Sequence, residues 1–217
     1  ESNHTLNQSV VSLSVFRGSV ICCFIEIICY FRALKYWEKL TLIKSISGIR
    51  GTIGGKPGDN LTPQDIVKYT AAYGAWLRKK KLASYKVVIG RDGRLSGQMV
   101  QQIVTGTLLA LGIDVVDLGL STTPTVEMAV VNEEANGGII LTASHNPKQW
   151  NALKLLNEKG EFISAADGDV VLKLAEKGDF DFAEVGKLGS YSTKDHYIDW
   201  HIEQILALPL VDVAAIK

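Results

Sequence analysis

Residues 138–147 are Gly138-Ile139-Ile140-Leu141-Thr142-Ala143-Ser144-His145-Asn146-Pro147, an apolar run that passes directly into a polar loop. A short apolar run of this kind, bounded by turn residues, is typical of a buried strand. The Asn-Pro pair that closes the loop favours a turn. A serine hydroxyl held on a loop at a strand end is well placed for chemistry. The stretch therefore predicts both a central strand and a candidate site.

The segments on either side alternate between strand and helix patterns. Upstream, Thr62-Pro63-Gln64-Asp65 predicts a helix start, with a threonine cap, proline at the first helical position and an acid in the first turn. The elements that follow are a strand over 86–90, a helix over 96–111, a strand over 114–119, a helix capped by Thr123, and a strand over 137–141. This order predicts an α/β fold that binds ligands at the carboxyl ends of its strands.

The chain continues with one more strand and two helices. A strand is expected over 151–156, turned at 157–160, and helices are expected over 164–177 and 194–206. About sixty residues follow the turn, which is too few for a second complete α/β domain of typical size.

The composition bounds the classes of protein and partner. The chain has 217 residues, a formal net charge of +0, 47% hydrophobic and 21% charged residues, as in an ordinary soluble domain. The chain has no excess of basic residues, so a nucleic-acid partner is not expected. The three cysteines, Cys22, Cys23 and Cys29, match neither a disulfide framework nor a zinc site, so a reducing, cytoplasmic setting is expected.

Residues 1–40 differ in character from the rest. The apolar run from Val10 to Phe31 is interrupted by Arg17 and Glu26, which are costly near the centre of a membrane span. In order of preference, we interpret this segment as a non-native or upstream-translated extension, a weak membrane anchor or a signal peptide. We expect no membrane contact for residues 41–217.

The Ser144-His145 pair does not match a hydrolase. A catalytic triad needs a histidine ring that reaches the serine, and adjacent loop residues point in different directions. The Gly-x-Ser-x-Gly elbow is also absent, because Ala143 and His145 flank the serine.

A serine that carries a phosphoryl group needs other partners, and the sequence offers them. Cations and backbone donors stabilise the dianion, and an acid/base serves the accepting hydroxyl. Arg50 lies in a glycine-flanked segment that we expect to be a loop, and Arg91 and Arg94 flank Asp92-Gly93 at a strand end. Lys154 follows Ser144 by ten residues, and a partly buried lysine near other cations can exchange protons.

Three motifs in this order resemble those of the α-D-phosphohexomutases. They are the segment from Ser45 to Gly51, the segment Gly90-Arg91-Asp92-Gly93-Arg94-Leu95-Ser96-Gly97, and Thr142 to Pro147 followed by Asn151 and Lys154. The resemblance implies a three-layer α/β/α domain with a mixed sheet over residues 41–160. It also implies that residues 161–217 are the truncated start of a second domain.

The resemblance further implies an enzyme that moves a phosphoryl group between C6 and C1 of a hexose phosphate through a bisphosphorylated sugar. Ser144 would be the phosphoryl carrier and one ligand of Mg²⁺, and Lys154 the general acid/base. Arg50 and His145 would support the reacting groups, while Arg50, Lys154 and Asn151 would bind substrate or phosphate. A hexose 1,6-bisphosphate would serve as activator and intermediate.

The opening Ser45-to-Gly51 motif and Lys148-Gln149-Trp150-Asn151 look most like bacterial phosphoglucosamine mutases. That similarity implies conversion of glucosamine-6-phosphate to glucosamine-1-phosphate, with phosphoglucomutase or phosphomannomutase as the alternative. A non-catalytic α/β module that binds an anion is the alternative of a different class. The chain alone is expected to be inactive, because the family's metal aspartates and phosphate-binding domain would lie beyond Lys217.

Considered one at a time, several of these residues could have a purely structural role. Arg91 and Arg94 are expected to pair with Asp92 or neighbouring loops, and Asn151 could brace the turn. The family's metal site uses an Asp-x-Asp-x-Asp run, and Asp167-Gly168-Asp169 only partly matches it because residue 171 is valine. We expect that segment to be the acidic first turn of a helix and assign it no metal role.

Overall fold

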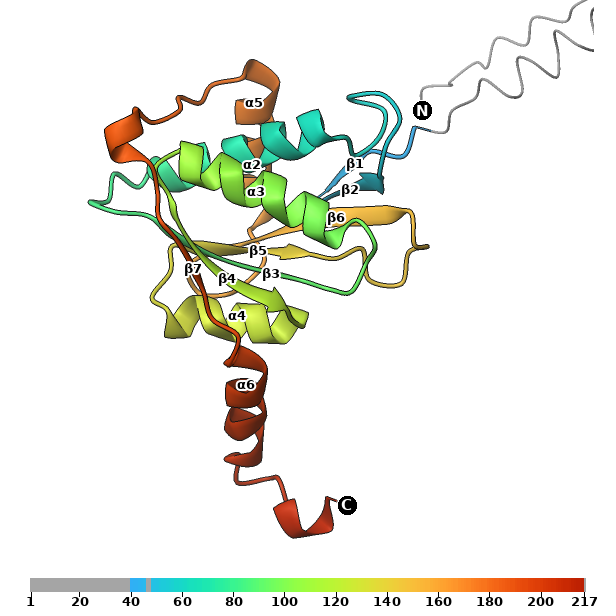
Figure 1. The fold of residues 1–217 in the computed structure, drawn as a ribbon, viewed down its shortest axis with the longest axis vertical. Coiled ribbons are helices and arrows are strands. Elements are labelled where there is room, and N and C mark those ends of the chain that lie inside the picture. The colour runs from blue at the N-terminus through green and yellow to red at the C-terminus, as the bar shows by residue number, and fades with distance from the viewer. Residues whose placement is uncertain (1–39, 46–47, 217) are drawn as a thin grey trace, which may run out of the picture. The chain divides into compact units, whose positions relative to one another are not determined.

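The computed structural model describes residues 40–45 and 48–216, and these form a seven-stranded sheet (Figure 1). The predicted extension over residues 1–40 lies outside the described residues except for Leu40. The strand order is β1-β2-β6-β5-β3-β4-β7. The strands are β1 (Ile43–Ser45), β2 (Gly48–Thr52), β3 (Lys86–Arg91), β4 (Asp114–Leu120), β5 (Gly137–Leu141), β6 (Trp150–Leu156) and β7 (Tyr191–Thr193).

The sheet is mixed, as the resemblance implied. Strands β5, β3, β4 and β7 pair in parallel, whereas β1, β2 and β6 pair antiparallel with their neighbours and β6 pairs antiparallel with β5. Parallel strands share one carboxyl edge, so the loops after β3 and β5 emerge side by side. The backbone bond from Asp92 N–H to Leu141 O, 3.1 Å long, joins the starts of these two loops.

Helices cover both faces of the sheet, which confirms the three-layer architecture. Figure 1 shows α2 (Pro63–Arg78), α3 (Gly97–Ala110) and α5 (Ala165–Lys177) on one side and α4 (Thr123–Asn132) on the other. The helix α6 (Tyr197–Leu206) follows β7 and packs against α4, and single 3-10 turns lie at Val185–Lys187 and Val213–Ala215. In residues 40–45 and 48–216, none of these helices has the length and apolar character needed to cross a bilayer.

Each face of the sheet has its own apolar core. The larger core joins Val87, Ile89 and Ile139 to the helices on the α2 side. The smaller core joins Val88 and Ile140 to α4 and to Tyr197 of α6. Neighbouring strand residues point to opposite faces, so the continuous apolar runs in β3 and β5 fill both cores.

The local helix signals are confirmed with small shifts. Thr62 and Asp65 form the capping box of α2, with Pro63 as the first helical residue. Thr122, and not Thr123, caps α4, because its hydroxyl accepts the bond from Thr125 N–H. The last helix begins at Tyr197, three residues after the expected start at Lys194.

The acidic pair near residue 167 belongs to a helix start, as expected. Ser164 caps α5, and Asp167 lies in the first turn, where its carboxylate accepts a 3.2 Å bond from Trp76 Nε1.

One expectation about the N-terminal motif is wrong. The glycine-flanked segment around Arg50 is the strand β2 and not a loop, because its backbone pairs with β6 over Ile49 to Thr52.

The packing continues through residue 160 without a break. The helix α5 packs against α2, and β7 extends the same sheet beside β4. Residues 161–193 therefore add to the layers already formed.

Candidate active site around Ser144

The loop that carries Ser144 joins β5 to β6 at the carboxyl edge of the parallel strands. Ser144 and His145 are exposed, whereas Thr142 and Ala143 are buried. Ser144 has φ 55, a left-handed conformation that serine seldom adopts. The backbone therefore turns sharply at the residue predicted to react.

Four of the five predicted site residues line one cavity of about 190 Å³. Ser144 and His145 come from the loop, Arg50 comes from β2 and Lys154 comes from β6. Arg50 lies opposite Ala152, and Lys154 lies two residues further along β6. Residues two apart on a strand share a face, which is why Arg50 and Lys154 meet beside the serine. The other lining residues are Thr142, Ala143, Asn146 and Ala152.

Asn151 does not line this cavity. It precedes Ala152 and so points to the opposite face of β6. The side chain is fully buried, and its Nδ2 donates a 3.0 Å bond to Ser96 Oγ. Asn151 therefore braces the start of β6 against Ser96, the residue before α3, and its contact with phosphate stays a prediction.

The cavity is cationic. Arg50 Nε is buried and has no hydrogen-bond partner among the described residues. Lys154 Nζ lies 5.7 Å from the centre of the Phe162 ring. Burial raises the pKa of Glu127, and the charge of Lys154 opposes that rise, so a partly buried carboxyl group lies within electrostatic reach of the lysine. Two cations beside an exposed hydroxyl favour an anionic ligand.

Arg94 holds the loop in place from the neighbouring β3–α3 connection. Its guanidinium donates to the backbone carbonyls of Ser144, Asn146, Pro147 and Trp150. It also pairs with Asp92 at 3.1 Å. The predicted structural role of Arg94 therefore has a specific target, the Ser144 loop. Sequence reasoning found the arginine but not the four carbonyls, which lie 50 to 56 residues away along the chain.

Asp92 and Thr142 support the same loop from its other end. The Thr142 hydroxyl donates a 2.6 Å bond to Asp92 Oδ2 and accepts a 3.0 Å bond from Ser144 N–H. Sequence reasoning gave Thr142 no separate role.

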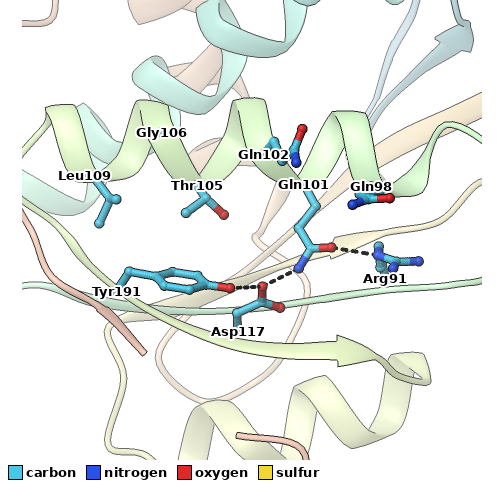
Figure 2. A pocket seen from close by; sticks show the side chains of 9 residues that line it. All are labelled: Arg91, Gln98, Gln101, Gln102, Thr105, Gly106, Leu109, Asp117 and Tyr191. Atoms are coloured by element: carbon cyan, nitrogen blue, oxygen red, sulfur yellow. Dashed lines mark hydrogen bonds between the residues drawn. The ribbon is translucent and has the colours of Figure 1, made fainter. Parts of the chain in front are cut away.

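A second and larger cavity of about 500 Å³ lies between α3, β4 and β7. Figure 2 shows hydrogen bonds that link Arg91, Gln101, Asp117 and Tyr191: Arg91 Nε donates to Gln101, and Gln101 and Tyr191 both donate to Asp117. Asp117 is 4% exposed, and its other oxygen accepts a 2.8 Å bond from Gly119 N–H. This α3–β7 groove, lined by Arg91, Gln98, Gln101, Gln102, Thr105, Gly106, Leu109, Asp117 and Tyr191, contains none of the predicted catalytic residues.

The described residues do not form a complete metal site. No group of three or more His, Cys, Asp or Glu side chains able to hold a metal ion occurs among them. Mg²⁺ prefers six oxygen ligands in a near-octahedral arrangement, and the cavity offers Ser144 Oγ without a carboxylate beside it.

Comparison with known proteins identifies the family. The sequence model described as "Phosphoglucomutase/phosphomannomutase, alpha/beta/alpha domain I" matches residues 42–182. The chain belongs to the phosphoglucomutase/phosphomannomutase family. The match extends past residue 160, in agreement with the packing of α5 on α2.

Curated relatives carry mutase names. A "Phosphoglucomutase/phosphomannomutase" of Thermococcus kodakarensis is 36% identical over 169 residues, which are 77% of this chain and 36% of the relative. A "Probable phosphoglucosamine mutase" of Methanosphaera stadtmanae is 36% identical over 163 residues, which are 72% of this chain and 35% of the relative. The chain thus spans about a third of the length of these relatives.

Solved structures share the fold. A putative phosphomannomutase from Thermus thermophilus superposes with a TM-score of 0.64 at 27% identity, covering 78% of this chain and 37% of that one. A family member from Burkholderia thailandensis gives a TM-score of 0.61 at 27% identity, covering 77% and 35%.

Proposed function

We propose that this chain supplies the phosphoserine part of a phosphohexomutase, an isomerase that acts by phosphoryl transfer. Phosphorylated Ser144 would pass its phosphoryl group to a free hydroxyl of a hexose phosphate, giving a hexose 1,6-bisphosphate. The other phosphoryl group of that intermediate would then return to Ser144, so the net result is movement between C6 and C1.

The observation that carries this proposal is the cavity that holds Ser144 together with Arg50 and Lys154. Transfer of a phosphoryl group depends mainly on positioning and on the stabilisation of negative charge. Arg50 would donate to phosphate oxygens, and its buried Nε has no hydrogen-bond partner among the described residues. Lys154 would move the proton of the accepting hydroxyl, and His145 would support the reacting groups from the adjacent loop position.

The substrate would be a sugar phosphate, most specifically glucosamine-6-phosphate converted to glucosamine-1-phosphate. Relatives named as phosphoglucosamine mutases and as phosphoglucomutase/phosphomannomutase support both this choice and its gluco or manno alternative. The hexose 1,6-bisphosphate would act as activator. We place the reaction in the cytoplasm because the chain has only three cysteines, all near its N-terminus.

Ser144 is retained as one proposed ligand of Mg²⁺, which would neutralise phosphate charge. The described residues alone do not hold the ion, so its other ligands would come from elsewhere. For the same reason we propose that the chain by itself does not turn over substrate.

The test uses the complete gene product that contains this chain and its Ser144→Ala variant. Each is incubated with glucose 1,6-bisphosphate or glucosamine 1,6-bisphosphate, and the Ser144 peptide is examined by mass spectrometry. One phosphate on that peptide is expected in the unsubstituted protein, together with mutase turnover that Ser144→Ala abolishes. Turnover that survives in Ser144→Ala, or active protein with no phosphate on Ser144, contradicts the carrier role.

The same experiment distinguishes a mutase from the alternative, a non-catalytic module that binds an anion. A non-catalytic module would bind the sugar phosphate, as measured by calorimetry, without placing phosphate on Ser144.

A further inference from the structure

The backbone of Ser144 is held on both of its sides by one neighbouring loop. On the amino side, Ser144 N–H bonds to Thr142 Oγ1, whose hydroxyl bonds to Asp92 Oδ2. On the carbonyl side, Ser144 O accepts from Arg94 Nη2. Asp92 and Arg94 are themselves joined by a 3.1 Å ion pair. The two residues therefore form a single support, here called the Asp92–Arg94 clamp.

The clamp reaches the loop beyond the serine as well. Arg94 Nη2 lies 2.9 Å from Asn146 O, and Nη1 lies 2.9 Å from Pro147 O and 3.1 Å from Trp150 O. Only a planar guanidinium offers enough donors in fixed directions for this set of acceptors. The Arg94 side chain is 10% exposed. Its bonds to Asn146 O and Trp150 O are partly buried, whereas those to Ser144 O and Pro147 O lie at the surface.

Apart from the clamp, the loop is held by backbone bonds such as Asn146 N–H to Ala143 O, 3.1 Å, and Ile53 N–H to Gln149 O, 2.8 Å. Ser144, His145, Pro147, Lys148 and Gln149 are all exposed, so the loop gains little from apolar burial. Its serine nevertheless keeps the sparsely populated left-handed conformation at φ 55. Such a conformation persists only where the surroundings fix it. The fixed backbone leaves the Ser144 side chain at the cavity while all the clamp bonds go to main-chain atoms or to Thr142.

We propose that Asp92 and Arg94 are positioning residues, which hold Ser144 in its left-handed conformation so that Oγ faces Arg50 and Lys154. The clamp touches neither substrate nor the reacting hydroxyl. It acts by making the reactive conformation the resting one, so that binding energy is not used to order the loop. This inference deepens the proposed function and rests on it only for the reaction that the positioned serine performs.

The decisive experiment measures the loop and not only the reaction. The experiment follows amide hydrogen exchange of Ser144 and Asn146, whose N–H groups are bonded within the loop. It compares the unsubstituted 217-residue chain with its Arg94→Ala and Arg94→Lys variants. Both variants should exchange at these amides at least about tenfold faster, because charge-assisted bonds to the carbonyls are lost. The amide of Val88, in the core strand β3, should be unaffected. Millimolar methylguanidinium should restore slow exchange in Arg94→Ala, and sodium chloride at equal ionic strength should not.

Arg78→Ala is the matched control. Arg78 also donates to backbone carbonyls, those of Leu111 and Asp181, but far from the loop. It should leave exchange at Ser144 unchanged. In the complete gene product, Arg94→Lys should lower kcat for phosphoryl transfer with little change in KM, and Arg78→Ala should lower neither.

Unchanged exchange at Ser144 and Asn146 in both Arg94 variants overturns the proposal. Equal acceleration at Val88 also overturns it, because the arginine would then stabilise the whole domain. If exchange responds as expected but unsubstituted Ser144 never takes phosphate, the positioning role stands and the proposed function fails.

Discussion

Two cavities of this domain, the α3–β7 groove and the Ser144 cavity, differ in how their polar groups are used. The α3–β7 groove is the larger, at about 500 Å³, yet the polar groups on its floor bond to one another from Arg91 through Gln101 to Asp117. The Ser144 cavity is about 190 Å³ and is lined by Arg50, whose buried Nε has no partner in the described part of the chain. The difference is one of charge and not of volume: the buried carboxylate of the groove is already bonded to neighbouring side chains, whereas the Ser144 cavity brings Arg50 and Lys154 beside an exposed hydroxyl.

The origin of the residues explains the contrast. The groove is built mainly from side chains on regular elements, where α3, β4 and β7 fix their partners. The serine of the smaller cavity lies on a loop. The backbone carbonyls of that loop, and not its side chains, accept the hydrogen bonds of Arg94. The reactive side chains there are left free to meet a ligand. Substitutions in the two regions should therefore have different kinds of effect.

The largest effect is expected from Lys154→Met in the complete gene product. Removal of a general acid/base typically costs about 10²–10⁴-fold in rate, and methionine keeps much of the side-chain volume. The expected result is a loss of kcat in that range, measured in the mutase assay. Lys148→Met is the control, since Lys148 is exposed on the Ser144 loop, which precedes β6, but lies outside the Ser144 cavity. Equal losses in both variants would show that positive charge near the site, and not proton transfer by Lys154, determines the rate.

Arg50 and Arg91 allow a direct comparison of the two cavities. Arg50→Ala should weaken binding of inorganic phosphate to the chain by about 10- to 100-fold, as expected for one charge-assisted bond. Arg91→Ala should leave phosphate affinity unchanged, because Arg91 Nε already donates to Gln101. Isothermal calorimetry measures both. The comparison fails if the Arg91 variant loses as much affinity as the Arg50 variant.

Signals that act over a few residues could be read from the sequence. Thr62, Pro63 and Asp65 define a helix start within four positions, and the structure places α2 there. The apolar runs of β3 and β5 likewise predicted buried strands. These features depend on local geometry, and they were sufficient to predict the α/β fold.

The strand β2 shows where local reading fails. Its glycines suggested a loop, but Gly51 lies in close packing, since a Cβ there would lie 3.0 Å from Leu61 N. The pairing of β2 with β6 joins segments about a hundred residues apart, and no local pattern reports it. The contacts of Arg94 with the Ser144 loop and the bracing place of Asn151 are non-local in the same way.

Asp117→Asn should affect stability and not phosphate transfer. The buried carboxylate accepts bonds from Gln101, Tyr191 and Gly119, and an amide nitrogen in its place would face a donor. Leaving a buried group unsatisfied costs about 1–3 kcal/mol, so the free energy of unfolding in urea should fall by that amount. Asp181→Asn, at an exposed position, should change it little. Phosphate uptake at Ser144 should remain normal in both variants. Its loss in Asp117→Asn alone would show that the α3–β7 groove affects the reaction in the Ser144 cavity.

Tyr191→Phe should have the smallest effect, and its size should depend on pH. Burial, and then the hydrogen bond and charge of Asp117, raise the pKa of Tyr191 from 10.0 to about 12. The folded protein therefore keeps this proton at pH values where the unfolded chain has released it. The stabilisation by the Tyr191 bond is present below the unfolded pKa of 10.0 and is lost as pH rises through about 12. In urea unfolding, the unsubstituted chain should exceed Tyr191→Phe by at most about 1 kcal/mol near neutral pH. That difference should shrink towards about pH 12, because the phenylalanine variant lacks the titrating group. A difference that grows with pH would mean that Tyr191 loses its proton more readily in the folded state, and the closed network drawn for the groove would then be wrong.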